Sequence, residues 1–485
     1  MRWSEKSAEA VVAGNGEGPN GRESERIVGL KRAKPQMSRQ MELPLRARAE
    51  GPKPKRSEEA PKATHEHQRS GTGRLMELVV ESTNMRAALQ RVRKNKGSPG
   101  VDGMTIAQLP ERLRTDWPKI REALLAGRYK PQPVCRRSIP KKGGGVRELG
   151  IPCVIDRLIQ QAILQVLQVR FEPTFSRHSH GFRPGRSQTT AVREAEGHIA
   201  DGRGWVVDVD LEKFFDRVNH DVLMGKLAKR IDDKRLLGLI RAYLVAGVMV
   251  GGVILERFEG TPQGGPLSPL LANVLLDEVD RELERRGHAF VRYADDCNVY
   301  VRSRRAGERV LELLRRLYAG LRLRLNETKS AVAEVSTRQF LGFTAGIAAD
   351  GNVEWSVSKR ALKAMKDRVR EMTGRSCGRN IRRVVEELAT YLPGWKNYFR
   401  LGLTPRVGEQ LDGWIRRRLR ALQLRHWKHG PRAYRALRSR GVDVFKARSA
   451  AKLLRRWWHT SNSGPVKIAL PNRYFDALGL PRLAT

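Results

Sequence analysis

The sequence predicts an α+β protein in which a mixed region is followed by an all-helical region and a small basic C-terminal segment. Alternating apolar residues predict strands at 205–211 and at 290–301, because successive side chains point to opposite faces of a strand. Apolar residues at helical spacing predict amphipathic helices at 156–171 and 308–324. Beyond Val357 the spacing is helical, with helices expected at about 358–374, 380–401 and 405–427.

Size and charge limit the class of protein. The chain has 485 residues, so we expect two to four domains. Its net charge of +41 favours a polyanionic partner, for which nucleic acid is the usual candidate and a membrane surface the competing one. No run reaches the roughly 18 apolar residues of a transmembrane helix, so we expect no membrane partner. Four widely spaced cysteines exclude a disulfide framework and a cysteine-based zinc site, and they suit a reducing cytoplasm.

Residues 1–74 combine 16 Lys and Arg residues with 10 Glu residues and show little apolar periodicity. This composition predicts a mostly disordered extension. The extension could contact RNA, but a solvated tail is the favoured interpretation.

The region that follows carries two basic loops. The expected elements are, in order, a helix from Leu75, a basic Gly- and Pro-rich loop at 94–103, a helix at 107–127, and strands at 134–140 and 146–151. The strands are joined by Lys141-Lys142-Gly143-Gly144-Gly145, which could hold backbone and ammonium groups over a triphosphate. A plain exposed hairpin explains this connection equally well. A second basic loop, 180–187, opens another helix.

Two carboxylates share one face of the strand Trp205–Leu211. Val207, Val209 and Leu211 face one way, and Asp208 and Asp210 face the other. The strand runs into Glu212–Asp216, where we expect a helix to begin. A surface strand with two acids is the plain interpretation, but an acid at the end of a core strand, five residues before the aromatic Phe215, is a more specific pattern.

The segment 261–273 is a Gly- and Pro-rich loop that enters an apolar helix. A helix start explains Ser268 and Pro269 as cap and first-turn residues. It does not explain Gln263-Gly264-Gly265, which would let the backbone approach a ligand closely.

Adjacent acids occupy the turn of a predicted hairpin in Tyr293-Ala294-Asp295-Asp296. Two neighbouring carboxylates repel each other and have poor strand propensity, so a nearby cation usually compensates them. Mg²⁺ prefers oxygen ligands of this kind. The alternative is a solvated turn, since Asp is common in turns.

The C-terminal helices are strongly basic. Residues 401–460 contain 16 Lys and Arg residues against 3 acids, with tryptophans interleaved among them. Such helices suit a structured nucleic acid, and most of the aromatic rings are expected in the core, so the charges are the stronger candidates for contact.

Taken together, these blocks resemble the reverse transcriptases that bacterial group II introns encode and that also act as splicing maturases. The resemblance covers about 75–485. It rests on Lys96–Gly103, Ile139–Lys141, Arg147–Pro152, Gly181–Ser187, Asp210–His220, Gln263–Asn273, Tyr293–Asp296 and Phe340–Phe343, which occur in the family's order.

The resemblance implies a right-hand polymerase fold with an antiparallel palm sheet and helical thumb. It implies fingers at 75–200, a palm at 201–350, a thumb or maturase domain X at 351–430, and a basic DNA-binding segment at 431–485. Relatives often continue into a nuclease domain with a His-Asn-His core, and neither that core nor its paired cysteines occurs here. We therefore expect no second-strand nicking by this polypeptide.

The family pattern also assigns site residues. Asp210, Asp295 and Asp296 match the acids that bind two Mg²⁺ ions for nucleotidyl transfer. Phe215 matches the ring that excludes a 2′-hydroxyl, and the remaining contacts implied for the incoming dNTP are Lys141, Arg147, Gln263, Gly264 and Lys329. Expected RNA-binding residues are Lys94, Lys96, Arg183, Arg186, Lys396, Arg416, Arg417 and Arg420.

The implied partners are group II intron RNA, an RNA template with a DNA primer, target DNA and dNTPs, with the protein in the bacterial cytoplasm and at the nucleoid. Two alternatives stay open: a non-enzymatic RNA-binding splicing factor, and a domesticated reverse transcriptase of the retron or phage-defence type. Intact acids argue against the first, and the Gln263–Pro269 block together with the long thumb argues against the second.

Overall fold

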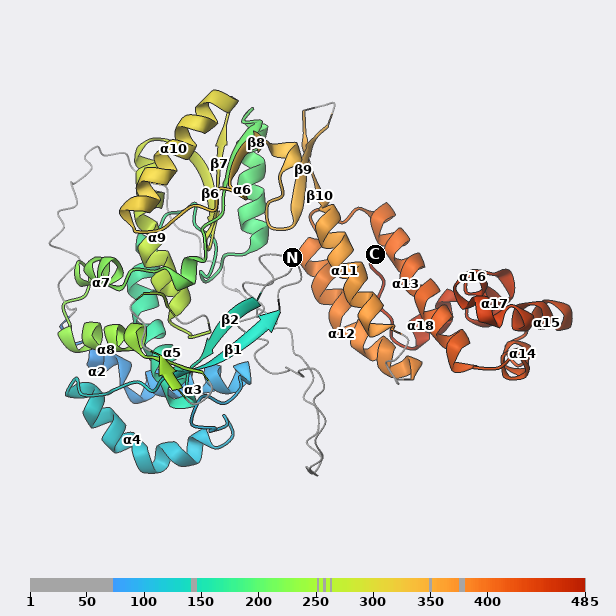
Figure 1. Cartoon of the computed structure of the whole chain (residues 1–485), viewed down its shortest axis with the longest axis horizontal. Helices are drawn as coiled ribbons and strands as arrows, with labels where there is room; N and C mark the ends of the chain where they lie inside the picture. The colour runs from blue at the N-terminus through green and yellow to red at the C-terminus, as the bar shows by residue number, and fades with distance from the viewer. Residues whose placement is uncertain are drawn as a thin grey trace, which may run out of the picture. The chain divides into compact units, whose positions relative to one another are not determined.

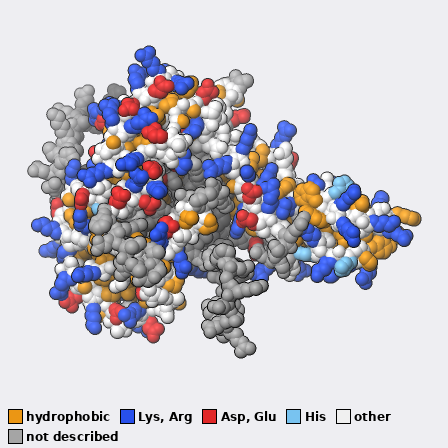
Figure 2. All heavy atoms as spheres, in the orientation of Figure 1, with side chains coloured by type: hydrophobic (Ala, Val, Ile, Leu, Met, Phe, Trp, Pro, Cys, Tyr) orange, Lys and Arg blue, Asp and Glu red, His pale blue; other side chains and the backbone are white. Residues whose placement is uncertain are grey.

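The computed structural model describes residues 73–140, 146–250, 253–255, 259–261, 264–348, 351–374 and 380–484. They form two compact units, an N-terminal unit at 73–333 and a C-terminal unit at 334–484 (Figure 1). The predicted disordered extension therefore lies, up to residue 72, outside the described residues. Lys and Arg side chains are spread over the visible face, as the net charge requires (Figure 2).

A four-stranded sheet forms the centre of the N-terminal unit, with strand order β6-β7-β3-β8. Its strands are β3 (Trp205–Val209), β6 (Ala289–Tyr293), β7 (Asp296–Val301) and β8 (Ala331–Glu334). The pairs β6–β7 and β3–β7 are antiparallel. The sheet lies between α6 (Gln188–Ala200) on one side and α9 (Ser268–Arg285) with α10 (Arg304–Gly320) on the other (Figure 1).

A second sheet has the order β2-β1-β4-β5. Strands β1 (Val134–Pro140) and β2 (Val146–Ile151) have the predicted bounds and pair antiparallel. β4 (Val248–Val250) joins β1 in parallel, and β5 (Val253–Leu255) pairs antiparallel with β4. The sheet is therefore mixed, and it unites segments about 100 residues apart, which local periodicity does not predict.

The other helices of the N-terminal unit surround these sheets and share one apolar core. They are α2 (Leu75–Val79), α3 (Ser82–Asn95), α4 (Leu109–Leu125), α5 (Val154–Phe171), α7 (His220–Ala228) and α8 (Lys234–Val245). α5 is buried on most of its surface, which fits its largely apolar sequence. A 3₁₀ turn, η2 (Glu172–Thr174), continues α5.

The C-terminal unit is helical apart from one short hairpin, β9 (Phe343–Ile347) with β10 (Val353–Val357). The expected helices are present as α11 (Lys359–Met372), α12 (Ile381–Phe399) and α13 (Pro405–His426). The tight turn expected at Phe340–Phe343 is also present, with hydrogen bonds in both directions between these two residues. Shorter helices follow: α14 (Gly430–Arg438), α15 (Val444–Lys452), α16 (Trp457–Thr460), α17 (Gly464–Ala469) and α18 (Asn472–Ala477).

Three local predictions need correction. The helix expected to begin at Glu212 is instead a 3₁₀ turn, η3 (Phe214–Asp216), because Lys213 adopts a left-handed conformation at φ +45°. Ser268 is not the cap of α9 but its first residue, buried and hydrogen-bonded to Thr261. α10 begins and ends four residues before its predicted bounds of 308 and 324, since Ser303 caps its start.

The compact units divide the chain at residue 333, whereas the predicted palm extends to 350. The domain bounds given above stay predictions. No helix in the described part of the chain is long and apolar enough to cross a membrane.

Candidate active site

The hairpin β6–β7 turns through only two residues, Ala294 and Asp295, since Tyr293 pairs with Asp296. Ala294 has a left-handed backbone, φ +57°, as tight hairpin turns require of at least one central residue. A residue with a Cβ pays roughly 1–2 kcal/mol for this conformation, so the surrounding structure must hold the turn.

The register of the neighbouring strand brings a third acid to this turn. β3 pairs with β7 so that Val209 lies opposite Cys297. Continuing that register by one residue puts Asp210, directly after β3, opposite Asp296. Asp295 is buried, while Asp210 and Asp296 are partly exposed. Three carboxylates that are distant in sequence therefore gather at one end of the sheet.

The segment between α10 and β8 holds Asp210 from the other side. The backbone N–H of Asn326 donates to the Asp210 carbonyl at 2.8 Å, and the Asp210 N–H donates to Ser330 Oγ at 3.1 Å. The Asp210 carboxylate accepts from Asn326 Nδ2 at 3.3 Å and from Lys329 Nζ at 3.2 Å. The Lys329 side chain is 44% exposed, so its ammonium group is held loosely and can change partner.

Asp208, on the same face of β3, has a different environment. It lies opposite Asn298 in β7. With the Asn298 amide oriented by its hydrogen-bonding partners, Nδ2 donates to Asp208 Oδ1 at 3.2 Å. Asp208 is thus engaged within the sheet, whereas Asp210 lies at the strand end beside the turn, which favours Asp210 as the functional acid.

A buried network supports the backbone of the turn, and no pattern in the sequence predicted it. Arg292 and Asp280 are fully buried and form an ion pair, with Arg292 Nη2 at 2.6 Å from Asp280 Oδ2. Arg292 Nη1 donates to the Ala294 carbonyl at 2.8 Å and to Asn273 Oδ1 at 2.9 Å. Burial lowers the pKa of Arg292, but the Asp280 carboxylate outweighs this effect and the pKa rises.

The neighbouring segment completes the support. Asn273 Nδ2 donates to the Gly181 carbonyl at 3.0 Å. A Cβ at Gly181 would collide with the backbone of Ala294, so only glycine fits against the turn. Two features of the sequence could have indicated this buried network. Arg292 lies inside an apolar strand, and Asn273 and Asp280 are seven residues apart, on one face of an apolar helix.

Comparisons with known proteins identify the family of this chain. Residues 139–345 match the family model "Reverse transcriptase (RNA-dependent DNA polymerase)", and residues 362–441 match "Group II intron, maturase-specific domain". Protein YkfC of Escherichia coli (strain K12) is 34% identical over 305 residues, covering 54% of this chain and 80% of YkfC. The chain belongs to the group II intron reverse transcriptase/maturase family.

Two further similarities are partial. The group II intron-encoded protein LtrA of Lactococcus lactis subsp. cremoris is 37% identical over 212 residues, covering 43% of this chain and 35% of LtrA. The chain therefore matches about a third of that relative's length. A chain of the partial Cas6-RT-Cas1–Cas2 complex is 25% identical, with a TM-score of 0.34, and the match covers 54% of this chain and 44% of that one.

The reverse transcriptase domain and the mixed fold followed by a helical maturase region are thus as predicted. Polymerases of this family typically use divalent metal ions. The three gathered carboxylates fit that requirement, because they offer only hard oxygen donors and their mutual repulsion favours a bound cation. Asp210, Asp295 and Asp296 would hold the ions.

The predicted nucleotide contacts of this reverse transcriptase are only partly described. Lys141 and Gln263 lie outside the described residues, and for Arg147 the structure describes the backbone in β2 alone. Phe215 is half-buried, packs edge-on against Phe214 at 5.1 Å between ring centroids, and accepts a backbone hydrogen bond from Thr261 at 2.7 Å. Gly264 has φ +128°, and a Cβ there would lie 2.9 Å from the Gly150 carbonyl oxygen of β2.

Three of the predicted RNA contacts, Arg183, Arg416 and Arg420, are buried and bonded within the protein. Arg183 donates to Glu172 and to the Ser176 and Ser179 carbonyls. Arg416 pairs with Asp476 at 2.9 Å. Burial and these internal partners leave Arg183, Arg416 and Arg420 poorly placed to contact a phosphate, and their role in RNA binding stays a prediction.

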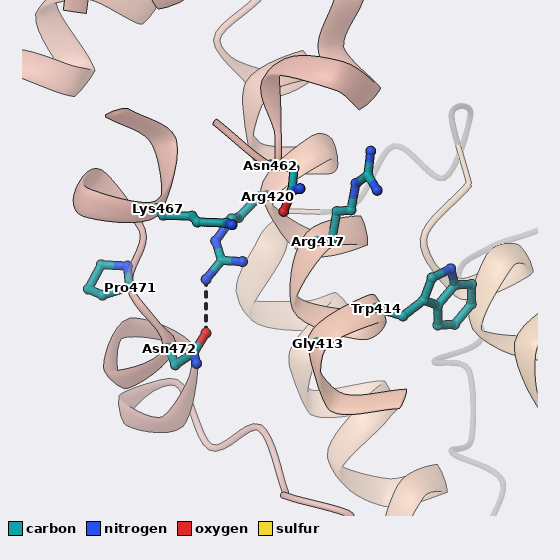
Figure 3. A pocket seen from close by; sticks show the side chains of 8 residues that line it. All are labelled: Gly413, Trp414, Arg417, Arg420, Asn462, Lys467, Pro471 and Asn472. Carbon is teal, nitrogen blue, oxygen red and sulfur yellow. Dashed lines mark hydrogen bonds between the residues drawn. The ribbon is translucent and has the colours of Figure 1, made fainter. Parts of the chain in front are cut away.

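Arg420 and Arg417, both on α13, differ in burial and in their partners. Arg420 donates to the Leu470 carbonyl at 2.9 Å. It also donates to Asn472 Oδ1 at 2.9 Å, as Figure 3 shows. Arg417 is half-buried and stacks on Trp458 at 4.1 Å. Among the other predicted RNA contacts, Lys94 and Lys96 are exposed, and Arg186 and Lys396 are half-buried.

Proposed function

We propose that this protein copies RNA into DNA at the end of the β3–β7 sheet, with Asp210, Asp295 and Asp296 holding two divalent cations. The observation that supports this site is the strand register, which puts Asp210 opposite Asp296 beside the buried Asp295. When bound, the cations would activate the primer 3′-hydroxyl and stabilise the departing pyrophosphate.

The residues around these acids have distinct tasks in the proposal. Asn326 and Ser330 fix the backbone of Asp210, which holds this residue in place beside the turn. The Lys329 ammonium compensates Asp210 and would move to the triphosphate as it binds. Phe215 would pack against the incoming sugar and reject a 2′-hydroxyl. Lys141, Arg147, Gln263 and Gly264 would line the rest of the nucleotide site.

We further propose that the chain binds group II intron RNA and promotes its splicing and retrohoming. The maturase-specific match at 362–441 and the basic helices of the C-terminal unit support this role. Lys94, in the last turn of α3, and Lys96, directly after α3, are both exposed and are the strongest candidate RNA contacts in the N-terminal unit.

Primer extension on an RNA template tests the polymerase half. Asp210→Asn should lower the rate of cDNA synthesis by about a hundredfold or more, because it removes a charged metal ligand. Asp208→Asn is the matched control: it changes an acid two residues away on the same face of β3, and it should retain most activity. Equal loss in both variants, with folding intact, would contradict the assignment of Asp210.

Splicing of the intron RNA tests the second half. The double variant Asp295→Ala, Asp296→Ala should lose cDNA synthesis and still promote splicing, because RNA folding needs binding surface rather than a metal site. If wild-type protein promotes splicing but never extends a primer, the non-enzymatic splicing factor is the correct alternative. Primer extension without any effect on the intron RNA would instead favour a domesticated polymerase.

A further inference from the structure

Three metal-ligating side chains converge on the α6 side of the palm sheet. His178 lies in an edge segment that pairs with β6: the Arg292 N–H donates to the His178 carbonyl, and the His180 N–H donates to the Arg292 carbonyl. Glu194 and His198 are one turn apart on α6, so they share a helix face. The cluster thus joins two elements that come together only in the fold.

The ligand atoms have the spacing of a small cation site. One nitrogen or oxygen from each of His178, Glu194 and His198 lies within 4.8 Å of the other two. Metal–ligand bonds of about 2.0–2.1 Å bring tetrahedral ligand atoms to roughly 3.3 Å of one another. His198 Nε2 and Glu194 Oε1 are 3.9 Å apart, so a small inward shift of the side chains would suffice.

One ring nitrogen of His198 is left without a partner within the described part of the chain, which a cluster of salt bridges alone does not explain. Its Nε2 is buried and has no hydrogen-bond partner among the described residues. The distance to Glu194 is too long for a hydrogen bond. Burial lowers the pKa of His198, which favours the neutral imidazole that binds metals. A cation between Nε2 and the carboxylate would satisfy both groups.

The surroundings orient the three ligands. His180 Nε2 donates to the other carboxylate oxygen, Glu194 Oε2, at 2.5 Å. The His178 ring packs on Phe290 and the His198 ring on Tyr300, with centroid distances of 4.9 and 5.7 Å. Burial raises the pKa of Glu194, but hydrogen bonds from His178 and His180 outweigh it and bring the pKa to about 2.

Two existing contacts compete with a cation at His178. Its Nδ1 is hydrogen-bonded to Glu194 Oε1, and its Nε2 accepts from the exposed Arg177 Nε at 3.2 Å. A cation would replace the first, and the exposed Arg177 side chain can turn into solvent. The ligand side chains are 15–22% exposed, so the cluster is not sealed from solvent.

We propose that His178, Glu194 and His198 bind a single structural divalent transition-metal ion, with Zn²⁺ the expected species. Two imidazoles and a carboxylate select Zn²⁺ over Mg²⁺, so this site would be chemically distinct from the site formed by Asp210, Asp295 and Asp296. The ion would fasten α6 to the edge segment. Gly181, three residues after His178, packs against Ala294, so the fastened segment is the one that backs the Asp295–Asp296 turn.

The test uses the full-length, untagged protein after removal of metals by a chelator. Addition of ZnCl₂, followed by dialysis and elemental analysis, should give one equivalent of zinc per chain and a higher melting temperature. Co²⁺ in place of Zn²⁺ should give visible absorption of tetrahedral or five-coordinate cobalt. His198→Gln should lose the metal, the cobalt absorption and the metal-dependent stabilisation, while its melting temperature in chelator stays close to that of wild type.

Two further variants keep the outcome decisive. His180→Ala leaves the three ligands but removes the bond to Glu194 Oε2, and it should weaken zinc binding by about 10- to 100-fold. His65→Ala with His67→Ala removes another closely spaced pair of histidines and should leave binding unchanged. Zinc bound equally by wild type and His198→Gln, or no zinc bound by wild type, would overturn the proposal and leave a hydrogen-bonded cluster only.

Discussion

Both units of this protein bury arginines, but they use them differently. In the N-terminal unit, Arg292 pairs with the fully buried Asp280 and holds the backbone of the turn that presents two acids. In the C-terminal unit, Arg416 pairs with Asp412 and Asp476, and Arg420 holds the Leu470 carbonyl, so both fix the C-terminal helices against α13. One arrangement supports the turn of the proposed active site, and the other holds helices together.

The comparison shows how a surplus of positive charge should be interpreted. A basic helix contains two kinds of arginine. Some are buried and bonded to partners inside the protein, and others remain at the surface. Only the latter can release counterions from a phosphate backbone. Substitutions of buried and of exposed basic residues should therefore have different effects.

Arg292→Gln should have the largest effect. It leaves Asp280 buried without its charged partner, which costs about 3–5 kcal/mol of folding free energy, and it removes the bond to the Ala294 carbonyl. Urea denaturation should detect the lost stability, and primer extension by the remaining folded protein should be nearly abolished. Arg292→Lys, which keeps the charge but not the forked geometry, should fold better and still be slow.

The matched variant in the other unit is Arg416→Gln. It should also destabilise the fold, because Asp476 and Asp412 lose a buried partner. The rate of single-nucleotide incorporation at saturating primer–template should nevertheless stay close to that of wild type. If Arg416→Gln lowers the incorporation rate as much as Arg292→Gln does, the buried arginines of the two units do not have different roles.

Lys329→Met tests whether the ammonium group beside Asp210 assists nucleotide incorporation. Loss of the ammonium group should lower the incorporation rate by about a hundredfold if it assists the departing pyrophosphate. RNA affinity should be unchanged. Lys329→Arg, which can still donate to a phosphate, should recover part of the rate. A variant with normal rates would reduce Lys329 to a counter-charge for Asp210.

Phe215→Val tests selection of the sugar. A smaller side chain should accept a 2′-hydroxyl, so the ratio of deoxynucleotide to ribonucleotide incorporation should fall by roughly 10- to 200-fold. Competition between dNTPs and NTPs in primer extension measures this ratio. Phe215→Tyr keeps the ring and should keep the selectivity, whereas an unchanged ratio in Phe215→Val would assign selection to another residue.

The smallest effect is expected at exposed lysines. Lys94→Gln with Lys96→Gln should reduce the slope of log K against log salt for RNA binding by about 1 per lysine that contacts a phosphate. Arg420→Gln is the control from the other unit. Because Arg420 already bonds Leu470 and Asn472, its loss should change stability but not the salt slope.

The sequence alone determined the elements that depend on local pattern. The bounds of β1 and β2, the hairpin with Asp295 in its turn, and the helices α11 to α13 follow from the spacing of apolar residues and from turn chemistry. Eight blocks in order also sufficed to indicate the family, which the reverse transcriptase and maturase matches confirm.

Only the tertiary structure decided which side chains meet. The parallel pairing of β1 with β4, the partners of Asp208 and Asp210, the burial of Arg183, Arg416 and Arg420, and the convergence of His178 on Glu194 all join segments that are distant in sequence. The physical reason is that periodicity reports which face of an element is apolar, whereas partners are set by packing between elements, which no local pattern contains.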